Sequence, residues 1–448
     1  MSVDLVVKNA KLVSPRGIVE AGVAVKDGVI TMVARDIHLP DGIKVIDAKG
    51  QYILPGLLDG HVHTFLPPES PATGLKAAAK GGITTSFEMP GTQFGCFNSD
   101  EFKLKRETME KVAYVDFSIH AGCAHGFPGE LAKMHHAGST GNKFFICGAG
   151  PKWPHVLDAE ILERFREIAS VGGLALIHAE NDNIIKGNEK KLRGDGRKDF
   201  AAHLEWRPRI AEVEAGKRMI DYFEHTGCRG MIVHTSTPET ALYAAEARMR
   251  GVEAWIETCT QYLYLTEEDV KKNGPWNKFA PPPRSKADMA ELRRMLQNGL
   301  IQTIATDHAP YGKDRKEAGL EDIFESPMGM PGLETYLPVM LNGVNEGWLS
   351  LERLSAVSAE NPAKIYGISP KKGVLQPGAD ADMVFVDLDK EVTITNDDQI
   401  TACGWTPYDG MKVKGWMTRS IIRGEVVMED DQVLSKEGSG RFVSRLDA

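Results

Sequence analysis

The middle of the chain alternates short apolar runs with longer segments in which apolar residues recur every three to four positions. Short runs of this kind are typical of buried strands, and the longer segments are typical of helices that cover a sheet. Eight strands are expected, at residues 57–63, 83–89, 115–121, 143–147, 174–178, 230–234, 252–258 and 302–306. Helices are expected between them, at 75–80, 99–111, 157–170, 209–226, 238–250 and 286–297. Eight strand–helix units over about 310 residues predict an α/β fold, a (β/α)₈ TIM barrel with a parallel sheet.

Both ends of the chain show a different pattern, in which β-rich runs follow one another without helices. Asp27-Gly28 lies between two such runs and is a strong hairpin signal. We therefore expect a small β-sandwich domain formed from residues 1–55 and 368–448, with the barrel at 56–367. A doubly wound open sheet is the alternative, but no GxGxxG follows the first strand of the barrel segment.

Composition and charge narrow the functional classes. The chain is 42% hydrophobic and 26% charged, as in an ordinary globular protein, and its net charge of −9 argues against a nucleic-acid binder. Its six cysteines form no CxxC pair, which favours reduced thiols and a cytoplasmic location. Neither a signal-peptide pattern at the start nor an apolar run of about 18 residues is present, so no membrane span is expected.

Metal-binding residue types gather where the predicted strands end. His61 and His63 are two apart, so both side chains point to the same side of a strand. His178, His234 and Asp307 follow three other strands, and in a TIM barrel these ends form the catalytic rim. One such histidine alone is more often a hydrogen-bonded core residue, but four with an aspartate favour a zinc-like divalent site.

These residues lie in stretches that resemble the amidohydrolase superfamily, in particular its branch of dihydroorotases, allantoinases and hydantoinases. The resemblance covers nearly the whole chain. Its motifs are at residues 55–63, 81–85, 177–181, 261–263, 280–284, 306–310, 361–364 and 378–382. It implies hydrolysis of a cyclic amide or imide ring.

The resemblance also implies a ligand set. His61, His63 and Asp307 would hold one divalent ion, and His178 and His234 a second, with zinc expected and manganese or cobalt as alternatives. Lys143, carboxylated by carbon dioxide, would bridge them, because an unmodified ammonium has no lone pair for a cation. Its alternative role is that of a solvent-exposed lysine. A metal-bridging hydroxide would attack the ring carbonyl, and Asp307 would carry its proton to the leaving nitrogen.

The substrate loops depart from some branches of the family. No arginine follows His63 as in dihydroorotases, and no tyrosine follows Lys143 as in D-hydantoinases. The L-hydantoinase type is the nearest likeness, which implies a small hydantoin-like cyclic amide as substrate, with allantoinase or dihydroorotase activity as the alternatives. Residues expected to contact the substrate are Phe65, Trp153, His155, Thr258 and Met328; ordinary loop packing explains each aromatic one equally well.

Two further rim residues and the assembly complete the expectations. Asp59 either orients a ligand histidine or is a satisfied buried carboxylate, whereas His308 points away from Asp307 and is expected to be structural. A non-enzymatic scaffold of the same fold is opposed by the complete ligand set. The resemblance also implies a homo-oligomer, a tetramer or a dimer.

Overall fold

The computed structural model describes residues 2–91, 93–148 and 155–445. Parallel strands form the predicted barrel, in the order β6(Leu57–Val62), β7(Ile83–Glu88), β8(Asp116–Ile119) continued by β9(Ala121–Gly122), β10(Asn142–Phe145), β11(Leu174–His178), β12(Arg229–Ile232), β13(Ala254–Cys259) and β14(Thr303–Ala305). A parallel bridge between Val62 and His308, with a 2.9 Å bond from His63 N to His308 O, closes the circle. The (β/α)₈ prediction is confirmed, and all strand carboxyl ends face one rim.

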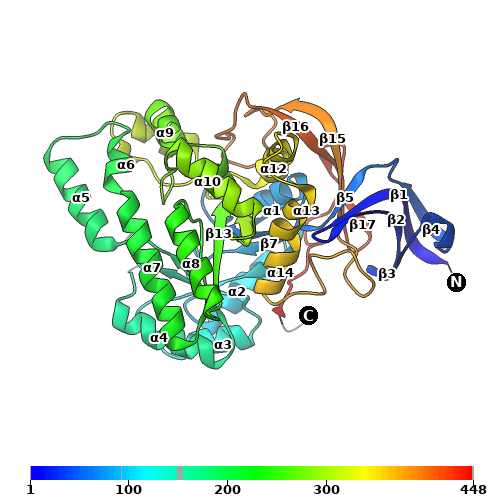
Figure 1. The fold of residues 1–448 in the computed structure, drawn as a ribbon, viewed down its shortest axis with the longest axis horizontal. Coiled ribbons are helices and arrows are strands. Elements are labelled where there is room, and N and C mark those ends of the chain that lie inside the picture. The colour runs from blue at the N-terminus through cyan, green and yellow to red at the C-terminus, as the bar shows by residue number, and fades with distance from the viewer. Residues whose placement is uncertain (1, 92, 149–154, 446–448) are drawn as a thin grey trace.

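Helices surround the barrel (Figure 1). They are α1(Pro71–Lys80), α2(Ser99–Glu110), α3(Glu130–His136), α4(Asp158–Ser170), α5(Asp182–Gly194), α6(Ala202–Trp206), α7(Arg209–Thr226), α8(Pro238–Met249), α9(Glu267–Asn273), α10(Lys286–Gln297), α11(Lys313–Glu317), α12(Tyr336–Asn345), α13(Leu351–Ser355) and α14(Asn361–Ile365). Ser70 and Ser285 start α1 and α10 with capping boxes, each side chain accepting from a free backbone amide of the first turn. Across the described residues, no helix is both long and apolar enough to cross a membrane.

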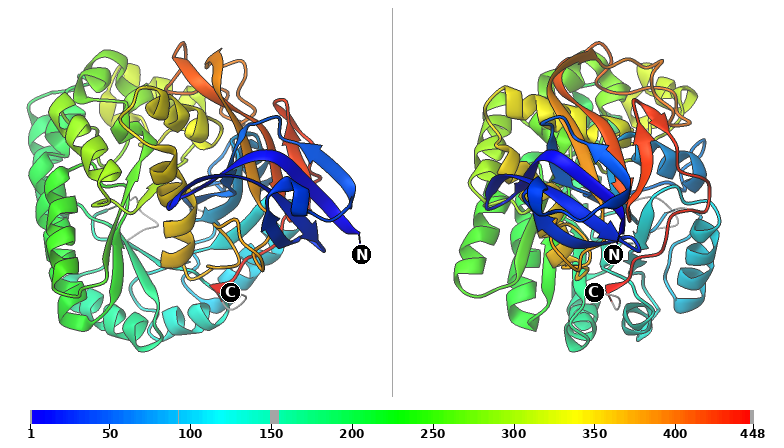
Figure 2. Two further views of the ribbon diagram at one scale, coloured as in Figure 1. Left: turned by 45° about the vertical axis from the view of Figure 1, so that its right-hand side comes forward. Right: turned by 90° about the vertical axis from the view of Figure 1, so that its right-hand side faces the viewer.

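Strands from both termini share a second sheet, which lies to one side of the barrel (Figure 2). It runs in the order β18(Gln432–Val433), β17(Glu425–Glu429), β16(Lys412–Ile422), β15(Met383–Thr393), β5(Tyr52–Pro55), β1(Val3–Ser14), β2(Gly17–Lys26), β3(Val29–Ala34), with β4(Gly42–Asp47) paired to β1. Asp27 and Gly28 both have positive φ, as the predicted hairpin turn requires. The sheet encloses its own apolar core, including Val23, Ile53 and Phe385, and forms the expected β-sandwich domain.

A buried charge cluster joins this sheet to the barrel. The Lys372 ammonium lies 2.6 Å from Asp116 of β8 and 2.9 and 2.7 Å from Asp380 and Asp382, which precede β15. Arg423, in the turn after β16, pairs with the other Asp116 oxygen. One ammonium therefore ties a barrel strand to the segment that enters the second sheet.

Candidate metal centre

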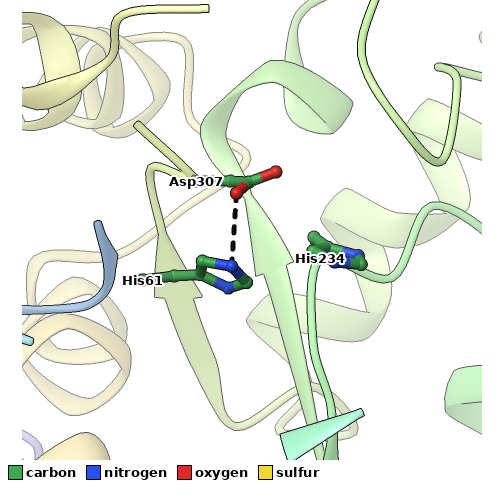
Figure 3. Close-up of side chains that lie close together, drawn as sticks. All are labelled: His61, His234 and Asp307. Carbon is green, nitrogen blue, oxygen red and sulfur yellow. Dashed lines mark ion pairs between the residues drawn. The ribbon is translucent and has the colours of Figure 1, made fainter. Parts of the chain in front are cut away.

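All six residues predicted as metal ligands line one cavity of about 440 Å³ at the carboxyl ends of the barrel strands. They are His61, His63, Lys143, His178, His234 and Asp307. His234 and Asp307, just beyond β12 and β14, have φ of 40° and 49°, a backbone region that non-glycine residues adopt rarely. Such strain is typical of functional sites, and here it occurs where both strands turn their side chains into the cavity (Figure 3).

The side chains are close enough to share ions. His61 Nε2 lies 3.2 Å from Asp307 Oδ1 and 3.3 Å from Lys143 Nζ, and His63 Nε2 lies 3.7 Å from the same Asp307 oxygen. The rings of His178 and His234 are 4.6 Å apart. His234 Nδ1 is buried without a hydrogen-bond partner among the described residues. Imidazole and carboxylate donors with an unsatisfied buried nitrogen fit a divalent ion of the zinc type.

Burial sets the protonation of the site. It lowers the pKa of His61, His63 and His234 well below 6.5, so these rings are neutral and keep a lone pair for an ion. Burial also lowers the pKa of Lys143 to about 8, although Asp307 and Glu257 oppose the change. The Lys143 side chain is enclosed rather than solvent-exposed, since the residue is 1% exposed.

Two carboxylates, for which the sequence pattern gives no signal, fix the ligand rings. Glu257 Oε1 lies 2.9 Å from His61 Nδ1, which leaves Nε2 facing the cavity. Glu180 Oε2 lies 2.8 Å from His178 Nε2, which leaves Nδ1. Burial opposes ionisation of Glu180, but Arg207 and His178 lower its pKa to about 2. Carboxylates in this position orient metal-binding imidazoles and raise their basicity.

Asp59 contacts no ligand ring. Its Oδ1 accepts from the backbone N of His61 at 3.2 Å and of Thr306 at 3.1 Å, and its Oδ2 accepts from Thr306 Oγ1 at 2.6 Å. Of the two roles left open for Asp59, the structure favours the satisfied buried carboxylate, which here joins β6 to the end of β14. His308 Nδ1 accepts from Gly332 N, so His308 is structural, as expected.

The residues expected to contact substrate are distributed unevenly. Met328 lines the cavity. Phe65 is buried outside the cavity lining, its ring 5.0 Å from the Lys105 ammonium, and Thr258 donates to the carbonyl of Thr235. His155 lines a separate hollow beside Asp182, and Trp153 lies outside the described residues. The remaining apolar wall consists mainly of Leu66, Phe145, Trp206, Phe279 and Tyr311.

Trp206 and Phe279 were missed because they belong to insertions. Trp206 ends the short helix α6, and Phe279 lies in a loop between α9 and α10. Neither segment directly follows a barrel strand, so the rule that places catalytic residues at strand ends does not reach them.

The comparisons with known proteins agree on one family. A model of the amidohydrolase family matches residues 52–427. An L-hydantoinase from Paenarthrobacter aurescens is 38% identical over 99% of this chain and 98% of its own length. An allantoinase from Solibacter usitatus is 32% identical over 97% and 96%. The solved structure of an L-hydantoinase (dihydropyrimidinase) from Arthrobacter aurescens has a TM-score of 0.96 at 38% identity, covering 99% of this chain and 100% of that one.

Proposed function

The chain belongs to the amidohydrolase family, and on this premise we propose that it hydrolyses the ring C–N bond of a cyclic amide or imide of the hydantoin class. The observation that carries the proposal is the convergence of four histidines, Lys143 and Asp307 on one cavity. The names of the relatives, L-hydantoinase and allantoinase, support the reaction class. The complete donor set opposes a non-enzymatic scaffold.

The cavity residues divide into two groups of ligands. His61, His63 and Asp307 would hold one divalent ion, and His178 and His234 would hold the other, with Lys143 as an N6-carboxylated bridge. Zinc matches these nitrogen and oxygen donors, and manganese or cobalt would also bind. When bound, the ions would supply a hydroxide nucleophile at neutral pH and polarise the carbonyl under attack.

The chain's own side chains orient the site and move the proton. Glu257 holds His61 through Nδ1, and Glu180 holds His178 through Nε2. An Asp307 carboxylate oxygen takes the proton of the attacking water and delivers it to the ring nitrogen. This delivery is required because an amide nitrogen leaves poorly until it is protonated.

The character of the wall favours an apolar ring substituent. Leu66, Trp206 and Met328 lie on it, and the guanidinium of Arg207, which also lines the cavity, is already paired with Glu180. A substrate carboxylate would therefore compete with Glu180 for its cation, which disfavours dihydroorotate. A ureido group, as in allantoin, would need hydrogen-bond partners, which the described part of this wall offers sparsely.

A hydrolysis panel tests the proposal. Hydantoins with apolar 5-substituents, unsubstituted hydantoin, dihydrouracil, allantoin and dihydroorotate are assayed on enzyme whose metal content is measured. We expect about two divalent ions per chain and the highest kcat/KM on the substituted hydantoins. Lys143→Ala is expected to keep the fold and lose nearly all activity, with partial rescue by short-chain carboxylic acids. A loaded enzyme inactive on the whole panel contradicts the proposal.

We also propose a cytoplasmic homodimer or homotetramer. All six cysteines are free and buried, which fits a reducing compartment. Ile210, Leu242 and Met249 expose apolar side chains on the adjacent helices α7 and α8, a surface that a second copy would cover. Light scattering at micromolar concentration tests the assembly, and a monomer contradicts it.

A further inference from the structure

Two fully buried lysines adjoin one wall of the cavity without lining it. Lys278 and Lys316 are both 0% exposed, and neither is used by the chemistry described above. Lys278 immediately precedes Phe279 and Ala280, which line the cavity, and Lys316 belongs to α11. Burial lowers the pKa of Lys278 to about 7. Asp322 and Glu325, whose charges act on Lys278, pair with Lys198 and Arg193 instead.

Among the described residues, both side chains donate to backbone carbonyls alone. The Lys278 ammonium donates to the carbonyls of Ile323 and Ser326, and to that of Phe324 at 3.5 Å. The Lys316 ammonium donates to the carbonyls of Pro327, at 3.0 Å, and Gly329, at 2.9 Å, and to the Lys278 carbonyl at 3.2 Å. That Lys278 carbonyl also accepts from Gly329 N at 2.9 Å. Five carbonyls of segment 323–329 thus accept hydrogen bonds from this lysine pair.

Stability alone does not explain why two lysines are buried here. Burying an ammonium without a countercharge costs several kcal/mol, and an apolar side chain of similar length would avoid that cost. What the lysine pair adds is a fixed path for a loop that has no strand or α-helix of its own between Asp322 and Gly332. The loop needs such a path because Pro327, Met328 and Gly329 form part of the cavity wall.

We propose that Lys278 and Lys316 are positioning residues that set the 327–329 wall and thereby select the ring substituent that the cavity accepts. This inference rests on the proposed function. Neither lysine lines the cavity or hydrogen-bonds to a proposed metal ligand. Loss of either lysine is therefore expected to change the KM for a substituted ring and to leave kcat nearly unchanged.

The test compares Lys316→Met with a matched control on hydantoin and 5-benzylhydantoin. The control is Arg248→Met. Within the part of the chain that the structure describes, Arg248 also donates only to carbonyls, those of Ala254 and Leu300, at the opposite end of the barrel. In Lys316→Met we expect KM for 5-benzylhydantoin to rise roughly tenfold or more, with kcat and the KM for hydantoin within about threefold of the parent. Metal content should equal the parent's. In the control, both KM values should stay within about twofold of the parent.

Equal KM increases for both substrates, or none, would overturn the proposal. If Lys316→Met fails to fold, Lys316→Gln is used, which keeps one donor group. Hydrogen exchange of segment 323–329 provides a readout independent of turnover: faster exchange in the lysine variant but not in the control supports the positioning role, and parent-like exchange overturns it. If the parent hydrolyses neither hydantoin, the exchange measurement still decides the role of the lysine pair, and the proposed function fails only if the loaded enzyme is inactive on the whole panel.

Discussion

Asp307 is proposed both to hold an ion and to carry a proton, and a single substitution separates the two tasks. Asp307→Asn keeps the size and one oxygen, so ions can still bind, but a neutral amide cannot accept the proton. We expect kcat to fall by roughly 10²–10⁴-fold while more than half of the metal remains. Steady-state kinetics with elemental analysis checks this. A loss of less than about tenfold with metal retained would assign the proton transfer to another group.

Glu257 supports the metal centre without lining the cavity. Its contact with His61 Nδ1 leaves Nε2 facing the cavity, so weakening this contact should weaken metal binding. We expect Glu257→Gln to lower metal affinity about tenfold or more, measured by competition with a chelator. Tyr366→Phe is the control: it removes a hydroxyl 3.4 Å from Glu257 Oε2 but keeps the carboxylate. Equal affinities in parent and Glu257→Gln would refute this support.

At the residue scale, the sequence could indicate site residues whose positions follow from the predicted strands. His61 and His63 are two apart on a strand, and His178 and His234 end strands, so a periodicity argument brings them to one rim. Glu257 has no such signal. Its partner lies 196 residues away, and a lone carboxylate in an apolar strand does not reveal which neighbour across the barrel it meets.

At the scale of elements, periodicity predicted several helices and strands but not α5 or α12, which span 13 and 10 residues. The expected helices at 209–226 and 286–297 match α7 and α10, and the strand at 174–178 matches β11. Short helices such as α6 and α11 were not anticipated, because five residues give too few turns for a period to be read. These insertions provide Trp206 and Lys316, so the least predictable elements shape the substrate wall.

The junction between the barrel and the second sheet should depend on Lys372. Lys372→Met leaves Asp116, Asp380 and Asp382 without their shared cation, and breaking a buried charge pair typically costs about 3–5 kcal/mol. We expect a loss of that size in the free energy of unfolding from urea denaturation. Lys364→Met, which removes an exposed lysine paired with Glu360, should cost less than about 1 kcal/mol. Similar losses in both variants would mean that the cluster does not hold the junction.

At the scale of the whole molecule, the closing of the barrel brings the site residues of its first and last strands together. β6 and the end of β14 meet through Val62 and His308, and Asp59 joins the same two segments, so the first and last barrel strands bring His61 and Asp307 together. Counting eight units predicts this closure. The β-rich ends likewise predict a shared domain, but not that β5 pairs with β15, since pairing partners depend on long-range packing that local pattern does not encode.

The free energy of unfolding should fall in mild acid, because the fold buries histidines that stay neutral while those of the unfolded chain take up protons. Burial lowers the pKa of His120 to about 3, although the carbonyl of Gly60 opposes the change, and burial places the pKa of His203 well below 6.5. In the unfolded chain both rings titrate near pH 6.5. Below that pH the two rings bind protons in the unfolded state but not in the folded state. The free energy of unfolding that is present above about pH 6.5 is therefore lost as the pH falls toward 3.

Each such histidine contributes a slope of up to about 1.4 kcal/mol per pH unit within this window. Urea denaturation of the metal-loaded protein between pH 7.5 and pH 5 measures this slope. The lower limit lies about one and a half pH units below the pKa of histidine in the unfolded chain. Between these limits His120→Gln should lose about 2 kcal/mol less than the parent, because one proton-binding group is removed from the unfolded state. His38→Gln, at an exposed position, should follow the parent curve. If His120→Gln and the parent lose stability in parallel, His120 is protonated in the folded protein, and the acid sensitivity must come from other groups.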